Sequence, residues 1–197
     1  MNIILFSRNF EKYISGYYHQ DIVEAIQVNT NSYIYGPGYD KYCSTDNFQN
    51  VVDKSIFNSL DDIDLIIFST SWDNDESELT VDPHPAIDFS NINIPKLYYL
   101  NKEYKKLDLR FKYIKKQKID FVATVNSSYK EWERDLKVRF LKYNFGINTK
   151  RIGVTSNKKK YDFGFTGALH NNHIDSRTII KKSIFKKEYH NTKSNIT

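Results

Sequence analysis

The segment IDLIIFST, residues 63–70, has the clearest β-strand pattern in this chain. Apolar and β-branched residues follow one another there, and Asp64 is the only charged residue among them. A short and almost continuous apolar run is typical of a strand that is covered on both faces, as in a parallel sheet. We therefore expect residues 63–70 to form a strand in the middle of a sheet.

Similar strand patterns occur on both sides of this segment. They are NIILFS, NSYIY, PKLYYL, DFVATVN and KVRFLKY, at residues 2–7, 31–35, 95–100, 120–126 and 137–143. Between them, apolar residues recur at helical spacing, most clearly in residues 22–26, 48–60 and 105–118. Strands that alternate with helices predict one parallel α/β sheet over residues 1–143, doubly wound and Rossmann-like.

Local turn and capping signals agree with these boundaries. Gly36-Pro37-Gly38 follows the second expected strand and predicts a turn, because proline and glycine both favour turn conformations. Ser127 or Ser128 is expected to begin a helix after residues 120–126. If Ser128 is the first residue, it forms a Ser-x-x-Glu capping pattern with Glu131.

Composition limits the classes of protein that the chain can belong to. It has 197 residues, of which 40% are hydrophobic, so it can bury a sizeable core. Cys43 is the only cysteine, which excludes an intrachain disulfide and argues against a zinc site built from cysteines. No window approaches the ~18 consecutive apolar residues of a membrane span. The expected location is therefore the cytoplasm.

The formal charge of +5 is divided unequally along the chain. Residues 1–99 carry 5 Lys/Arg and 15 Asp/Glu, a net charge of −10, which leaves +15 for residues 100–197. A basic half attracts anionic partners such as phosphorylated small molecules, nucleic acid or membrane surfaces, but it is also compatible with a solvated lysine-rich surface.

A second domain is expected to begin at YDFGFTGALH, residues 161–170. The aromatic residues suggest a short strand, and Gly164 and Gly167 suggest a tight turn before a helical pattern that contains Arg177. The polar, lysine-rich residues 144–160 are the expected linker. Because few residues follow His170, we expect residues 161–197 to be the truncated start of this domain.

Four segments in this order resemble GT-B glycosyltransferases of the spore-maturation, glycosyl transferase group 1 type. The segment KKKYDFGFTGALH followed by Arg177 resembles the start of their C-terminal domain. YIYGPGY, STSWD and IPKLYYLNKEY, at residues 33–39, 69–73 and 94–104, resemble parts of their N-terminal domain. The resemblance covers most of the chain.

The resemblance implies transfer of a sugar from a nucleotide-sugar donor to an acceptor hydroxyl, without a metal or a tightly bound cofactor. The acceptor would be a glycan, a protein or a small molecule, bound by the N-terminal domain. The nucleotide diphosphate would lie against backbone N–H groups of the second domain, a suitable anion site. Its candidate binding residues are Gly164, Thr166, Gly167, His170 and Arg177. The chain alone is expected to be inactive, and a separate chain could supply the donor domain.

Three residues are candidates for the catalytic base. In the family, the loop after the first strand lines the cleft, so His19 could approach a substrate, although a surface or helix-capping histidine is an equally ordinary interpretation. Asp73 or His84 could instead take a proton from the acceptor, provided that a dry environment shifts the pKa toward neutrality. Asp73 and Asp75 also fit an Asp-x-Asp metal motif, but a solvated acidic loop explains them more simply.

Two functions of other classes remain open. The first is a non-catalytic α/β domain that binds sugar or another protein, because the strand and helix patterns of such a domain are the same as those of an enzyme with this fold. A nucleic-acid-binding module could use aromatic residues of the basic half to stack bases, but their helical spacing favours the core, so no nucleic-acid partner is expected. These residues are Tyr104, Phe111, Tyr113, Tyr129 and Trp132.

Overall fold

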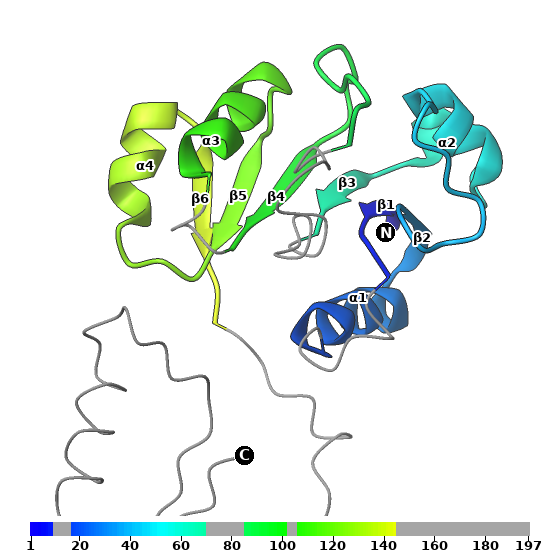
Figure 1. Ribbon diagram of the computed structural model, residues 1–197, viewed down its shortest axis with the longest axis horizontal. Helices are drawn as coiled ribbons and strands as arrows, with labels where there is room; N and C mark the ends of the chain where they lie inside the picture. Colours follow the sequence, from blue (N-terminus) through cyan, green and yellow to red (C-terminus); the bar gives the residue numbers. More distant parts are fainter. Residues whose placement is uncertain (10–16, 70–84, 102–105, 145–197) are drawn as a thin grey trace, which may run out of the picture. The chain divides into compact units, whose positions relative to one another are not determined.

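The computed structural model of the chain describes residues 1–9, 17–69, 85–101 and 106–144 (Figure 1). All of these residues belong to one unit, Met1–Asn148. The predicted domain 1–143 coincides with most of this unit. The predicted linker and second domain, residues 144–197, lie outside the described residues except for Asn144.

The described residues form one six-stranded sheet in which every neighbouring pair of strands is parallel. The order across the sheet is β2-β1-β3-β4-β5-β6. The predicted parallel α/β architecture is therefore confirmed, and the segment predicted for the middle of the sheet lies there as β3. The strands are β1 (Asn2–Phe6), β2 (Asn31–Tyr35), β3 (Leu65–Phe68), β4 (Lys96–Leu100), β5 (Phe121–Thr124) and β6 (Arg139–Lys142).

Helices cover both faces of the sheet, as a doubly wound fold requires (Figure 1). Helix α1 lies on one face, and α2, α3 and α4 lie on the opposite face. This division follows from the strand order. From β1 the chain crosses the sheet toward one edge to form β2, and from β2 onward it crosses toward the opposite edge. Because crossovers between parallel strands are right-handed, the two directions place their helices on opposite faces. The helices are α1 (Tyr17–Asn29), α2 (Phe48–Lys54), the 3-10 helix η2 (Leu60–Asp62), α3 (Leu107–Lys116) and α4 (Tyr129–Leu136).

Two hydrophobic clusters lie on the two faces of the sheet. The larger one, on the face of α2, α3 and α4, is rich in aromatic residues, and Phe89 lies at its centre. The ring of Phe89 stands 5.1 Å from that of Phe6 and 4.9 Å from that of Phe68, both nearly perpendicular to it. The smaller cluster consists of Ile3, Leu5, Val23 and Ile67 under α1.

The aromatic residues of the basic half contribute to the core, as their spacing predicts. Phe111, Tyr113, Tyr129 and Trp132 pack against the larger cluster, and the rings of Phe111 and Trp132 are 5.6 Å apart. Tyr104 lies outside the described residues. Within that description, no helix is long and apolar enough to cross a membrane.

The second helix is shorter than the helical pattern of residues 48–60 predicts. Helix α2 ends at Lys54, and Ser55 provides the cap: its Oγ donates to the Val52 carbonyl (2.7 Å) and accepts from the Phe57 N–H (3.0 Å). The chain therefore turns after Ser55, and Ile56, which was expected on the apolar face of the helix, is 59% exposed.

The capping pattern at the start of α4 is also different from the prediction. Ser128 is the N-cap residue, but its side chain makes no capping hydrogen bond. Instead, the Oδ1 atom of Asn126 accepts a hydrogen bond from the Ser128 N–H at 2.7 Å. An asparagine two residues earlier thus forms the turn that a serine cap was expected to form.

A buried lysine fastens the amino end of β4. Lys96 is 4% exposed, and its Nζ donates to the carbonyls of Ile92 (2.9 Å) and Ile94 (3.2 Å). The carboxylate of Asp120 lies 3.8 Å away and accepts from the Lys96 N–H at 2.8 Å. Burial lowers the pKa of the Lys96 ammonium, and the charge of Asp120 opposes this effect. These contacts make Lys96 a structural residue.

Candidate ligand site at the carboxyl edge of the sheet

The strand order creates a switch point between β1 and β3. The chain leaves β1 on one side to form β2 and returns on the other side to form β3, so the two connections diverge from the carboxyl ends of β1 and β3. In open α/β sheets, ligands bind in the crevice outside the carboxyl ends of the strands at such a point. The residues that directly follow β1 and β3 are therefore the candidates for a ligand site.

Two buried serines lie side by side at this point. Leu5 pairs with Ile67 and Phe6 with Phe68, so Ser7 and Ser69 occupy the next equivalent positions. Neighbouring strands of a sheet are about 4.8 Å apart. The Ser69 N–H donates to the Phe6 carbonyl at 2.9 Å, which continues the ladder, and both serines are at least 94% buried.

Helix α1 brings two further polar residues to the same face of this edge. Because α1 connects two parallel strands, it runs back along the sheet, and its first turn lies at the carboxyl edge. Val23 packs with Leu5 and Ile67. His19 precedes Val23 by about 6 Å along the helix, and Ser7 follows Leu5 by about 6.6 Å along the strand.

The two serines and the first turn of α1 therefore lie at the same edge, on the same face of the sheet. His19 is 4% exposed and Gln20 is 8% exposed. We call Ser7, Ser69, His19 and Gln20 the edge cluster.

The side chain of Gln20 supplies an acceptor that is not satisfied. Its Oε1 is buried and has no hydrogen-bond partner among the residues described. A buried polar atom without a partner costs about 1–3 kcal/mol. Groups of this kind are uncommon in folded proteins, and they are a reason to look for a ligand that donates a hydrogen bond.

At the same edge, Arg8 and Asn9 continue from β1. The Asn9 N–H donates to the Pro37 carbonyl at 2.9 Å, so this segment is tied to the loop that follows β2. Burial raises the pKa of the Tyr42 hydroxyl, and the positive charge of Arg8 opposes this effect. The centres of the Tyr42 and Tyr35 rings are 5.4 Å apart.

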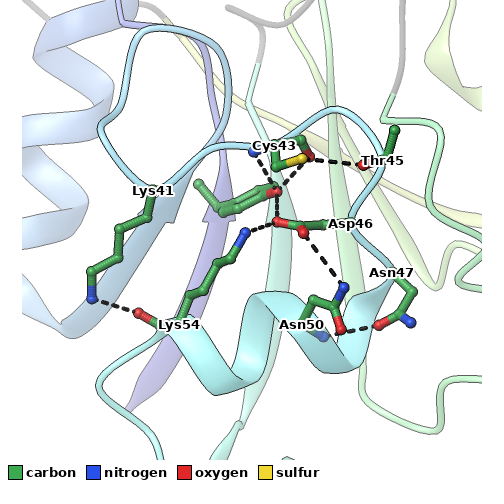
Figure 2. A network of polar contacts seen from close by, with 8 residues as sticks. Lys41, Cys43, Thr45, Asp46, Asn47, Asn50 and Lys54 are labelled. Carbon is green, nitrogen blue, oxygen red and sulfur yellow. Dashed lines mark hydrogen bonds and ion pairs between the residues drawn. The ribbon is translucent and has the colours of Figure 1, made fainter.

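A polar network holds the same loop at its far end (Figure 2). The carboxylate of Asp46 accepts a hydrogen bond from the Tyr35 hydroxyl and forms an ion pair with Lys54. Asn50 adds a longer bond of 3.4 Å from its Nδ2 atom. The hydrogen bonds from Lys54 and Tyr35 lower the pKa of Asp46, whereas burial and the bond to Asp46 raise the pKa of Tyr35.

Cys43 is exposed and lies in this loop. Its N–H donates to the Tyr35 hydroxyl at 3.0 Å, and its Sγ is 3.1 Å from Oγ1 of Thr45. Hydrogen bonding to Thr45 lowers the pKa of the thiol. Across the parts of the chain that are described, no three His, Cys, Asp or Glu residues are grouped so that they could hold a metal ion.

The predicted site residues have different outcomes. His19 lies in the first turn of α1 and is buried, so it is not a surface histidine. The alternative of a structural histidine at the start of the helix stays open, and the catalytic role of His19 stays a prediction. The other predicted residues lie outside the described ranges, so their roles stay predictions: Asp73, His84, Gly164, Thr166, Gly167, His170 and Arg177.

Sequence reasoning missed Ser7, Ser69 and Gln20 as site residues. A signal for the serines was present, because each one directly follows an apolar strand at the end where ligands bind. Comparison of the chain with protein-family models, curated proteins and solved structures gave no match.

Proposed function

We propose that this chain is the acceptor-binding part of a metal-independent glycosyltransferase that moves a sugar from a nucleotide-sugar to an acceptor hydroxyl. The motifs that resemble GT-B transferases support this proposal, and the parallel Rossmann-like sheet is compatible with it. In this proposal the acceptor lies at the edge cluster, and the nucleotide diphosphate lies at Gly164, Thr166 and Gly167, with His170 and Arg177 adding positive charge.

The observation that carries the proposal is the unsatisfied Oε1 atom of Gln20 within the buried edge cluster. A sugar presents several hydroxyl groups, each able to donate one hydrogen bond and accept others. One of these hydroxyls would donate to Oε1 of Gln20. Binding would therefore satisfy a group that folding alone leaves without a partner.

The chemistry of the proposed reaction needs one base. His19 takes the proton from the acceptor hydroxyl as its oxygen bonds to the anomeric carbon, and the bond from that carbon to the phosphate oxygen breaks. The electron pair leaves with the nucleoside diphosphate. The burial of His19 suits this role, because a base works best in a site from which water is excluded. Asp73 and His84 are the alternative bases.

The test compares Gln20→Leu with Gln27→Leu, which changes an exposed glutamine of the same helix. Binding of methyl glycosides and nucleotide-sugars is measured by titration calorimetry. We expect Gln20→Leu to weaken glycoside binding about tenfold, the effect of losing roughly 1.4 kcal/mol. Gln27→Leu should leave the affinity unchanged. Absence of binding to the unmodified chain, or equal binding by all three proteins, would contradict the proposal.

A second assay separates transfer from simple sugar binding. Because the chain alone is expected to be inactive, release of nucleoside diphosphate is measured with donor, acceptor and a separate chain that supplies the donor domain, for the unmodified protein and for His19→Ala. Loss of release with retained glycoside binding supports His19 as the base. Glycoside binding without any release, even when the donor domain is supplied, would favour a non-catalytic sugar-binding domain.

A further inference from the structure

The loop of residues 36–46, which joins β2 to α2, is fastened at both of its ends. Its second half ends at Asp46, just before the N-cap residue Asn47 of α2. Its first half passes the segment of Arg8 and Asn9 that leaves the carboxyl end of β1. The loop therefore connects a partly buried ion pair with the residues beside the edge cluster.

The fastening at Asp46 depends on its negative charge. The side chain of Asp46 is 7% exposed and contacts groups from two elements, Tyr35 at the end of β2 and Lys54 at the end of α2 (Figure 2). Tyr33, Tyr42 and Cys43 also interact with its charge, and Lys54 is the only cation that contacts it among the described residues.

The fastening at the other end depends on close backbone contact. Pro37 accepts a hydrogen bond from the Asn9 N–H at 2.9 Å. Gly38 has a φ of +88°, and a Cβ atom added there would stand 2.9 Å from the Cβ of Asn9. Between the two ends, the N–H of Tyr39 donates to the Gly36 carbonyl and the N–H of Tyr42 donates to the Tyr39 carbonyl, both at 3.1 Å. These two turns link the Asp46 end of the loop to the Pro37 end, so a shift at Asp46 is expected to move Pro37.

We infer that Asp46 is a positioning residue of the carboxyl-edge site. Asp46 fixes the position of the loop, and the loop in turn fixes the positions of Arg8 and Asn9 beside the carboxyl ends of β1 and β3. Asp46 does not touch the edge cluster. It acts through the loop and the Asn9–Pro37 hydrogen bond. Its effect on ligand affinity rests on the proposed function, whereas its effect on the loop does not.

The test uses Asp46→Asn, with Asp53→Asn as the matched control. Both changes remove one negative charge next to or within α2. Asp53, however, is exposed, and its carboxylate accepts a hydrogen bond from Nε2 of Gln49 at 2.8 Å, on the same helix. Amide hydrogen exchange is measured in both variants. In Asp46→Asn we expect at least about tenfold faster exchange at Asn9 and Tyr39, and unchanged exchange in β1 and β3.

Glycoside affinity is then measured by titration with the methyl glycoside that the unmodified protein binds most tightly. We expect Asp46→Asn to weaken binding several-fold and Asp53→Asn to leave it unchanged. Failure of every glycoside to bind the unmodified protein contradicts the proposed function, and the exchange data still decide whether Asp46 fixes the loop. Unchanged exchange at Asn9, a uniform increase over all strands, or faster loop exchange with unchanged affinity would each overturn the inference.

Discussion

Gly38 and Asn9 approach each other so closely that a single methyl group would not fit between them. The Cβ that any other residue would place at Gly38 comes within 2.9 Å of the Asn9 Cβ, and the φ of +88° is one that L residues rarely adopt. We therefore predict that Gly38→Ala lowers the free energy of unfolding by about 1–3 kcal/mol. Urea denaturation measures the change. Asp40→Ala, an exposed position of the same loop, should have little effect.

Lys137 ends helix α4 in the left-handed conformation, with a φ of 56°. This conformation costs most residues about 1–2 kcal/mol and costs glycine little, although glycine loses more entropy on folding. Lys137→Gly should therefore raise the free energy of unfolding by up to about 1 kcal/mol. Lys130→Gly, an exposed position within α4, should lower it by about 1 kcal/mol. Equal effects of the two changes would contradict this explanation.

The stabilising effect of Asp46 should depend on pH. Its pKa is lowered in the folded protein, so its contribution to stability is present above the unfolded pKa of about 3.9 and is lost as the pH falls through the folded pKa. The urea midpoint of Asp46→Asn should thus be lower than that of the unmodified protein at pH 7. The two midpoints should converge below about pH 3.9. A constant difference between pH 7 and pH 2 would show that the charge is not the cause.

Gln20→Leu should separate stability from binding. Replacing a side chain whose buried Oε1 has no hydrogen-bond partner by an apolar side chain of similar size removes the desolvation cost of that atom. We predict that the free energy of unfolding rises by about 1 kcal/mol while glycoside binding weakens. A decrease in stability would show that the amide is satisfied in the folded protein, and it would remove the reason for placing a ligand hydroxyl there.

The centre of the sheet could be predicted from the sequence because β1 and β3 are buried on both faces. Residues 3–6 and 65–68 are continuous apolar runs, and their burial decides where they lie. The length of α2 could not be predicted, since Val51, Val52, Ile56 and Phe57 continue the helical spacing across Ser55. The helix ends because of the hydrogen bonds of the Ser55 side chain, and the spacing of apolar residues does not reveal these bonds.

Of the edge cluster, only His19 could be named from the sequence, because its residue type alone suggests a chemical role. Histidine is a recognisable candidate base, so His19 could be found. The other members of the edge cluster are ordinary residues whose importance comes from strand register and from the strand order that places β3 beside β1. A sequence predicts parallel strands more readily than their order, and the position of Ser69 opposite Ser7 depends on that order.

Because its Nζ is enclosed, Lys96 can serve as a chemical reporter of local opening, unlike the exposed lysines of the described residues. Amine-reactive reagents need an accessible, uncharged nitrogen, and the Nζ of Lys96 is enclosed by two carbonyls and a carboxylate. Lys112 and Lys115 are exposed, so we expect such reagents to acylate them in the native protein. Lys96 becomes reactive only when the amino end of β4 separates from its neighbours, so its acylation rate records the opening of the centre of the sheet.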